Sequence, residues 1–137
     1  LNDNHVNKII QKLDIFREIS IIPNEKIQEL IDFSNGSPGR YLMNLECWLS
    51  ISIPLRQKLD IKIDNQIELL KLAKEITDEL NIEQQLWFID FEQNRIWMKE
   101  NNSNVVKKLE ELRKQLLKYV QPRLAWEVTL LEINLID

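Results

Sequence analysis

The stretch Q-P-R-L-A-W-E-V-T-L-L, residues 121–131, decides the fold that we expect for this chain. Pro122 favours the start of a helix. Proline has no backbone N–H, and the N–H of the first helical residue makes no hydrogen bond within the helix, so nothing is lost there. One stripe at helical spacing is formed by Leu124, Val128, Leu131 and Leu135. The other sides are mostly covered by Trp126, Leu130 and Ile133. A helix that is apolar on nearly every side must be buried against several neighbours. It is therefore either a central core helix or a helix that serves both a core and a seam between subunits.

Three long helices are expected before this one. Apolar residues recur there at spacings of three and four, as in an amphipathic helix. The expected stripes are Ile67, Leu70, Ala73, Ile76 and Leu80; then Ile82, Leu86, Ile89 and Ile96 with Trp87, Phe88, Phe91 and Trp97; then Val105, Leu109, Leu112, Leu116 and Tyr119. The expected caps are Asn65 with Glu68, Asn81 with Gln84, and Ser103 or Asn104. Short connections between these helices predict an antiparallel bundle.

A smaller helical module is expected upstream. Residues 4–11 form a weak helix candidate, and Asn24 is expected to cap a clear helix that Gly36 closes. The apolar face of that helix is Ile27, Leu30, Ile31 and Phe33. Ser37-Pro38 starts the next helix, with Tyr41, Leu42, Leu45 and Trp48 on its buried side. Residues 51–64 hold one short helix and the boundary. We therefore predict an all-α protein with modules at 1–51 and 52–137.

Composition supports this class and bounds the function. The chain has 137 residues, of which 44% are hydrophobic and 29% charged, and only two are glycine. Cys47 is the single cysteine, so an internal disulfide is excluded and the chain suits a reducing cytoplasm. We expect Cys47 to be a small buried apolar residue. No apolar run is long enough to span a membrane, and no signal peptide is visible. The chain begins at Leu1 instead of Met, which suggests a fragment.

The net charge of −4 argues against nucleic-acid binding over the whole surface of the chain. The charge is uneven, because residues 65–100 carry four basic and eight acidic side chains, whereas residues 101–137 carry six and five. A solvated helix face explains most of this pattern, and a weak phosphate-facing surface is the alternative.

Catalytic and ligand-binding patterns are missing from the sequence. His5 is the only histidine and lies near an end, so neither a catalytic triad nor a histidine metal site can be assembled. No phosphate-binding loop is present. We expect no catalytic residue, no cofactor and no metal. The four tryptophans are core residues or centres of protein interfaces, and acidic surroundings argue against base stacking by Trp87 and Trp97.

Two islands of the sequence, residues 27–42 and 69–135, resemble a known family. V-Q-P-R-L-A-W-E-V-T-L-L-E-I, residues 120–133, is similar to the signature N-x-x-P-R-L-A-x-E-x-x-L-L-x-L that closes the collar domain of bacterial clamp-loader subunits. The preceding L-W-F-I-D-F-E-Q-N-R-I-W, residues 86–97, resembles cyanobacterial delta-prime sequences in particular. The first island, residues 27–42, contains N-G-S-P-G-R and is similar to the delta-prime lid motif A-x-G-S-P-G-x-A. Residues 43–68 match no family pattern.

The lid motif bears on nucleotide sensing. In the related ATP-binding gamma/tau subunits the matching stretch is G-S-x-R-D-A, and its arginine reaches the nucleotide phosphates. Aligned on Gly36-Ser37, that arginine's position is taken by Gly39, and Arg40 falls about 100° further around the helix. The resemblance therefore implies a lid that does not sense ATP.

The resemblance implies the C-terminal part of the delta-prime subunit of the DNA polymerase III clamp loader, a lid remnant followed by a collar bundle. Its implied role is non-catalytic assembly of the cytoplasmic pentamer that loads the sliding clamp on primed DNA. The implied partners are the gamma/tau and delta subunits, with DNA reached only through the complex and no membrane. The expected interface residues are Trp87, Trp97, Pro122, Arg123, Leu124, Trp126, Leu130, Leu131 and Leu135. The alternatives are an ATP-sensing gamma/tau-like lid and collar, with Arg40 on phosphate, and an unrelated helical adaptor.

Overall fold

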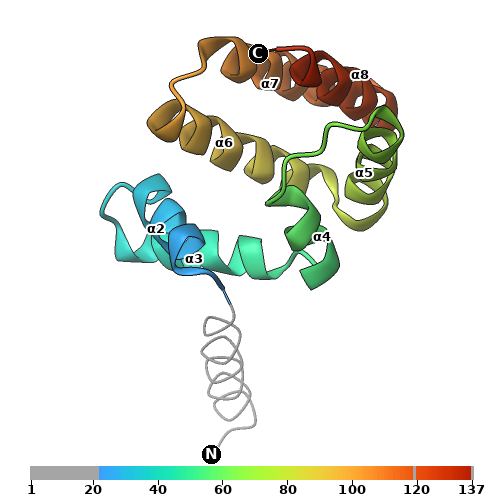
Figure 1. Cartoon of the computed structure of the whole chain (residues 1–137). Helices are drawn as coiled ribbons and strands as arrows, with labels where there is room; N and C mark the ends of the chain where they lie inside the picture. Colours follow the sequence, from blue (N-terminus) through green and yellow to red (C-terminus); the bar gives the residue numbers. More distant parts are fainter. Residues whose placement is uncertain (1–21, 119, 137) are drawn as a thin grey trace, which may run out of the picture. The chain divides into compact units, whose positions relative to one another are not determined.

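The structure, a computed structural model, describes residues 22–118 and 120–136 (Figure 1). This described part contains seven helices, labelled α2 to α8, and no strand. The all-α prediction is therefore confirmed. The chain divides into two compact units, Leu1–Ser50 and Ile51–Asp137, which we call unit 1 and unit 2. The helix candidate at 4–11, His5 and Tyr119 lie outside the described residues.

Unit 1 contains α2 (Asn24–Phe33) and α3 (Pro38–Leu49) packed on each other. Gly36 takes the left-handed conformation with φ 77°, as predicted for the turn between them. Ser37 caps α3 as predicted, and its Oγ accepts a hydrogen bond from the N–H of Arg40 at 3.3 Å. The predicted cap at Asn24 is wrong. The extended residue before α2 is Pro23, so Asn24 is already helical and makes no side-chain cap.

The buried apolar core of unit 1 includes Ile22, Leu30, Leu45 and Trp48. Lys26 lies 4.6 Å from the centre of the Trp48 ring and is paired with Glu29 at 3.3 Å. The expected apolar faces differ in two places, because Ile31 is 40% and Leu42 57% exposed. The buried side of α3 consists of Asn44, Leu45 and Trp48, of which Leu45 and Trp48 were predicted. Asn44 donates a hydrogen bond to the buried hydroxyl of Ser34 at 3.0 Å, so a polar contact occupies part of that interface.

Unit 2 is a helical bundle. Its elements are α4 (Ile53–Leu59), α5 (Gln66–Glu79), α6 (Ile82–Lys99), α7 (Ser103–Leu117) and α8 (Pro122–Asn134). Helix α8 packs against both α5 and α7, and α6 packs against α7. Asn134, at the end of α8, donates a hydrogen bond to the carbonyl of Asp64, just before α5, at 3.4 Å. Helices α5 and α8 are therefore antiparallel, as expected for this bundle.

The core of unit 2 follows most of the predicted stripes. The whole described stripe of α7 is buried, as are Ile89, Phe88, Phe91 and Ile96 of α6. On α5 the buried face is Leu69, Leu72, Ala73 and Ile76, so Ile67 lies outside it and is 64% exposed. Ile82, the first residue of α6, is also exposed, at 37%. The helical period was therefore predicted correctly, whereas Ile67 and Ile82 at the helix starts and Trp97 at the end of α6 were assigned to the wrong face.

The helix starts in unit 2 explain why these segments are separate helices. Asn81 and Gln84 form the predicted reciprocal capping box, with hydrogen bonds of 2.8 and 2.9 Å. Asn65 accepts the N–H of Ile67 at 2.8 Å, as predicted. It also accepts the N–H of Glu68 at 3.3 Å, which is one half of the predicted capping box. The Glu68 carboxylate pairs with Lys71 at 3.4 Å, and the other half of the box is not formed.

The predicted cap of α7 is wrong by one residue. Asn102, and not Ser103 or Asn104, accepts the N–H of Val105 at 3.3 Å. Asn101, directly before this cap, has a φ of 49°, so the chain turns sharply there before α7 begins.

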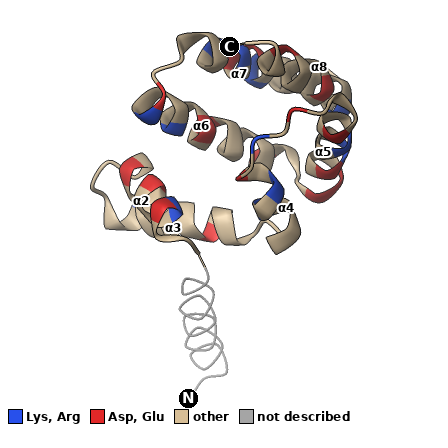
Figure 2. Ribbon diagram, in the orientation of Figure 1, with Lys and Arg blue, Asp and Glu red and all other residues tan. Residues whose placement is uncertain are grey.

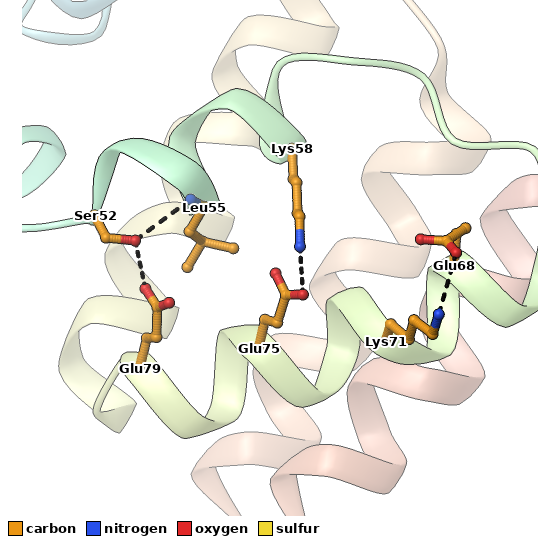
Figure 3. A network of polar contacts seen from close by, with 7 residues as sticks. All are labelled: Ser52, Leu55, Lys58, Glu68, Lys71, Glu75 and Glu79. Atoms are coloured by element: carbon orange, nitrogen blue, oxygen red, sulfur yellow. Dashed lines mark hydrogen bonds and ion pairs between the residues drawn. The ribbon is translucent and has the colours of Figure 1, made fainter.

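Helix α4 is held to α5 by polar contacts, which Figure 3 shows. The Ser52 hydroxyl donates to Glu79 at 2.8 Å and accepts the N–H of Leu55 at 3.3 Å, capping α4. Lys58 forms an ion pair with Glu75 one turn back along α5. The short helix expected within 51–64 therefore belongs to the larger unit.

Candidate interaction surface

The outer side of α8 carries a row of accessible apolar side chains. Leu124 is 53%, Val128 43% and Leu135 77% exposed, and Leu131 is half-buried. We call these four residues the α8 strip. Their spacings of four, three and four residues place them within about 60° on one helix face. The stripe that the sequence indicated is therefore directed outward and not into the bundle.

The opposite side of α8 forms the core. Ala125, Trp126 and Thr129 are buried there. The Trp126 ring is 1% exposed and lies 6.4 Å from the Phe88 ring between centroids. Trp126 thus belongs to the interior of its own unit and contributes no accessible surface. The accessible residues of α8 are therefore the ones that can still contact another subunit.

The charged residues that border the α8 strip are already paired within unit 2. Arg123 Nε lies 3.6 Å from Glu127 Oε1 on one border. On the other, Glu132 of α8 binds Lys108 of α7 at 3.0 Å. The hydrogen bond that Lys108 donates to Glu132, followed by the negative charge of Glu111, raises the pKa of Lys108 above its ordinary value. The strip is therefore an apolar surface between internally satisfied charges.

The other predicted interface residues take different positions. Trp87 is half-buried and packs edge-on against Phe91, with centroids 5.3 Å apart. Trp97 is 54% exposed near the end of α6, apart from the α8 strip. Pro122, Leu130 and Leu131 are half-buried, and Arg123 is exposed.

Two features near the start of α8 were not predicted. Leu117 and Val120 are 51% and 39% exposed beside the turn that leads into α8, and they add apolar surface at that end. A shallow hollow of about 470 Å³ is lined by Thr77, Leu80, Asn81, Ile82, Gln85, Gln121, Pro122 and Arg123. The sequence signal for Leu117 and Val120 was their position outside the buried stripe of α7, whereas the hollow depends on the α5–α8 packing.

Unit 1 presents the loop that the sequence analysis considered for nucleotide sensing. Gly39 and Arg40 lie in the first turn of α3, and both are exposed. Among the described residues, no group of histidine, cysteine and acidic side chains is placed to hold a metal ion. In the same residues, no helix has the length and apolar character needed to cross a membrane.

Comparison with known proteins matches the chain to a family. A family model described as "Cyanobacterial DNA polymerase III delta prime, C-terminal domain" matches residues 4–133. No curated protein and no solved structure matches the chain.

Proposed function

Because the chain belongs to the family of the cyanobacterial DNA polymerase III delta prime C-terminal domain, we propose that it is an assembly domain of the clamp loader. Its helices associate with helices of neighbouring subunits, and it does not take part in catalysis. Unit 1 corresponds to a lid remnant and unit 2 to a collar bundle. The partners are the gamma/tau and delta subunits, and DNA is reached through the assembled complex.

The observation that supports this proposal is the α8 strip. An isolated domain gains nothing from four apolar side chains on one accessible helix face, whereas a partner that covers them removes apolar surface from water. Burying one exposed leucine stabilises a complex by about 1.5–3 kcal/mol. A seam with three or four such residues and a rim of paired charges has the composition of a protein interface.

The test is to replace Leu124 and Val128 with glutamate together in the complete protein that carries this chain. The double variant should bind gamma/tau and delta subunits at least tenfold more weakly, measured by titration and by size-exclusion chromatography with light scattering. The matched control replaces Ile61 and Ile67 with glutamate, which are 63% and 64% exposed outside α8. The control should assemble normally.

Circular dichroism should show the same helix content in both double variants, because none of the four side chains is in the core. If the Leu124 and Val128 variant assembles as tightly as the control, the α8 strip is not the seam and the proposal fails.

A further inference from the structure

The outer face of α7 carries two exposed lysines, Lys107 and Lys114, and a third exposed lysine, Lys118, is the residue that follows its last turn. We call them the lysine strip. Their spacings of seven and four residues place them within about 40° around the helix and along about 16 Å of its axis. They form one straight row on a side of α7 that faces neither α6 nor α8.

Three other charged residues of α7 hold it in the bundle. Arg113 Nε binds Asp90 of α6 at 3.1 Å, and Lys108 binds Glu132 of α8 at 3.0 Å. Glu110 accepts a hydrogen bond from Gln93 of α6 at 3.2 Å. Within the described part of the chain, no ion pair or hydrogen bond engages the side chains of the lysine strip. Their positive charges are therefore available to an external partner.

Charge is also separated along unit 2. Residues 103–123 carry six basic and two acidic side chains, whereas residues 65–100 carry four and eight. Lys108, Arg113 and Arg123 are paired with Glu132, Asp90 and Glu127, so the lysine strip supplies the positive charge that these pairs leave. Figure 2 shows lysine and arginine segments along α7. The net charge of the whole chain is −4, so this positive region stands out against an acidic background. Such a region attracts polyanions at short range, within a Debye length of about 8 Å at physiological salt.

We propose that the lysine strip contacts the phosphate backbone of DNA. Lysine binds phosphate as a point charge without a demand for planar geometry. The other residues within about 60° of the centre of the strip are Ser103, Asn104, Glu110 and Glu111, so this face lacks the apolar centre that a protein partner requires. A row of about 16 Å spans about five nucleotide steps of one strand at about 3.4 Å each.

This proposal adds a direct DNA contact to the assembly role. It rests on the membership of a DNA polymerase III family and not on the α8 seam. The contact is weak and independent of base sequence, because it involves three phosphates at most and because Glu111 borders the strip.

The test replaces Lys107, Lys114 and Lys118 with glutamine in the complete protein. The matched control makes the same change at Lys62, Lys71 and Lys74, which are exposed lysines of the same unit. Fluorescence anisotropy of labelled duplex and single-stranded DNA is followed between about 50 and 200 mM salt.

The strip variant should bind DNA at least tenfold more weakly at the low-salt end. Its slope of log affinity against log salt should be smaller by about 2.7 for duplex or about 2.1 for a single strand. The control should keep most of its affinity. Glu111→Gln should bind DNA more tightly. Assembly with the other subunits should be unchanged in the strip variant, which separates this proposal from the α8 seam.

Three results would overturn the proposal. Equal losses in the strip variant and the control would show that only net charge matters. Unchanged binding in both would show that DNA does not touch this face. Displacement of DNA by polyglutamate of equal charge, at equal concentration, would identify a surface for acidic protein segments instead.

Discussion

The indole Nε1 of Trp126 donates a hydrogen bond to the side-chain oxygen of Gln85 across 2.9 Å in the core of unit 2. The amide nitrogen of Gln85 in turn donates to the carbonyl of Leu80, also at 2.9 Å. Trp126 is 1% and Gln85 2% exposed, so water does not replace either contact. One buried glutamine therefore connects α8 to the corner between α5 and α6 and satisfies two polar groups that folding removes from water.

The first prediction concerns this buried glutamine. Gln85→Leu leaves the Trp126 N–H and the Leu80 carbonyl without partners, and each unsatisfied buried group costs about 1–3 kcal/mol. We expect the free energy of unfolding to fall by about 2–4 kcal/mol in urea titration. Gln66→Leu, on the exposed first turn of α5, should change it by less than about 0.5 kcal/mol. Equal effects of the two substitutions would mean that the buried contact contributes no specific stability.

The second prediction concerns the cap of α7. Asn102→Ala removes the side chain that accepts the Val105 N–H and should lower the free energy of unfolding by about 1 kcal/mol. Ser103→Ala should be neutral or slightly stabilising, because Ser103 is the first helical residue and alanine has the higher helix propensity. Thermal or urea unfolding of the two variants checks this. A larger loss in Ser103→Ala would restore the cap that the sequence pattern indicated.

The helices were predictable from the sequence, because apolar spacing and caps are local signals. The stripe of α7 was assigned correctly, and so was the capping box at Asn81. The direction in which α8 points its stripe was not predictable, because the helix is apolar on several sides and only packing selects the inner one. Ala125 and Thr129 are small enough for close approach to α5 and α7, so that side is buried with Trp126.

The polar core contacts were also beyond the sequence pattern. Gln85 reads as a surface residue of an amphipathic helix, and its burial depends on Trp126, which lies 41 residues later. The lysine strip is likewise visible only after the partners of Lys108 and Arg113 are known, since the sequence alone shows a mixed charged helix.

The third prediction concerns Cys47, which is half-buried on α3. Burial, followed by the negative charge of Glu46, raises the pKa of the thiol above its ordinary value. A raised pKa in the folded state disfavours the reactive thiolate there. The titration of Cys47 therefore leaves the free energy of unfolding unchanged below the pKa of the thiol in the unfolded chain, and lowers it as the pH rises above that pKa. Iodoacetamide should therefore alkylate Cys47 more slowly in the folded protein than in urea at about pH 8.

Because Cys47 is the only cysteine, the total rate of thiol loss reports on this site alone. Glu46→Gln should speed the reaction of the folded protein and leave the reaction in urea unchanged. A folded-state rate equal to the rate in urea would contradict the assigned burial.

The last prediction separates the α8 strip from the core by one substitution made at two leucines. Leu112 of α7 is 0% exposed, and Leu112→Ala should lower the free energy of unfolding by about 2–5 kcal/mol because it leaves a cavity. Leu124 is 53% exposed, so Leu124→Ala removes contacts on one side only and should cost less than about 1 kcal/mol. Urea titration of the unassembled protein measures both values. After assembly with its partners, Leu124→Ala should weaken the complex, whereas the same protein alone stays stable. A cost at Leu124 as large as that at Leu112 would mean that its own protein covers the outer side of α8, and no seam would then be available there.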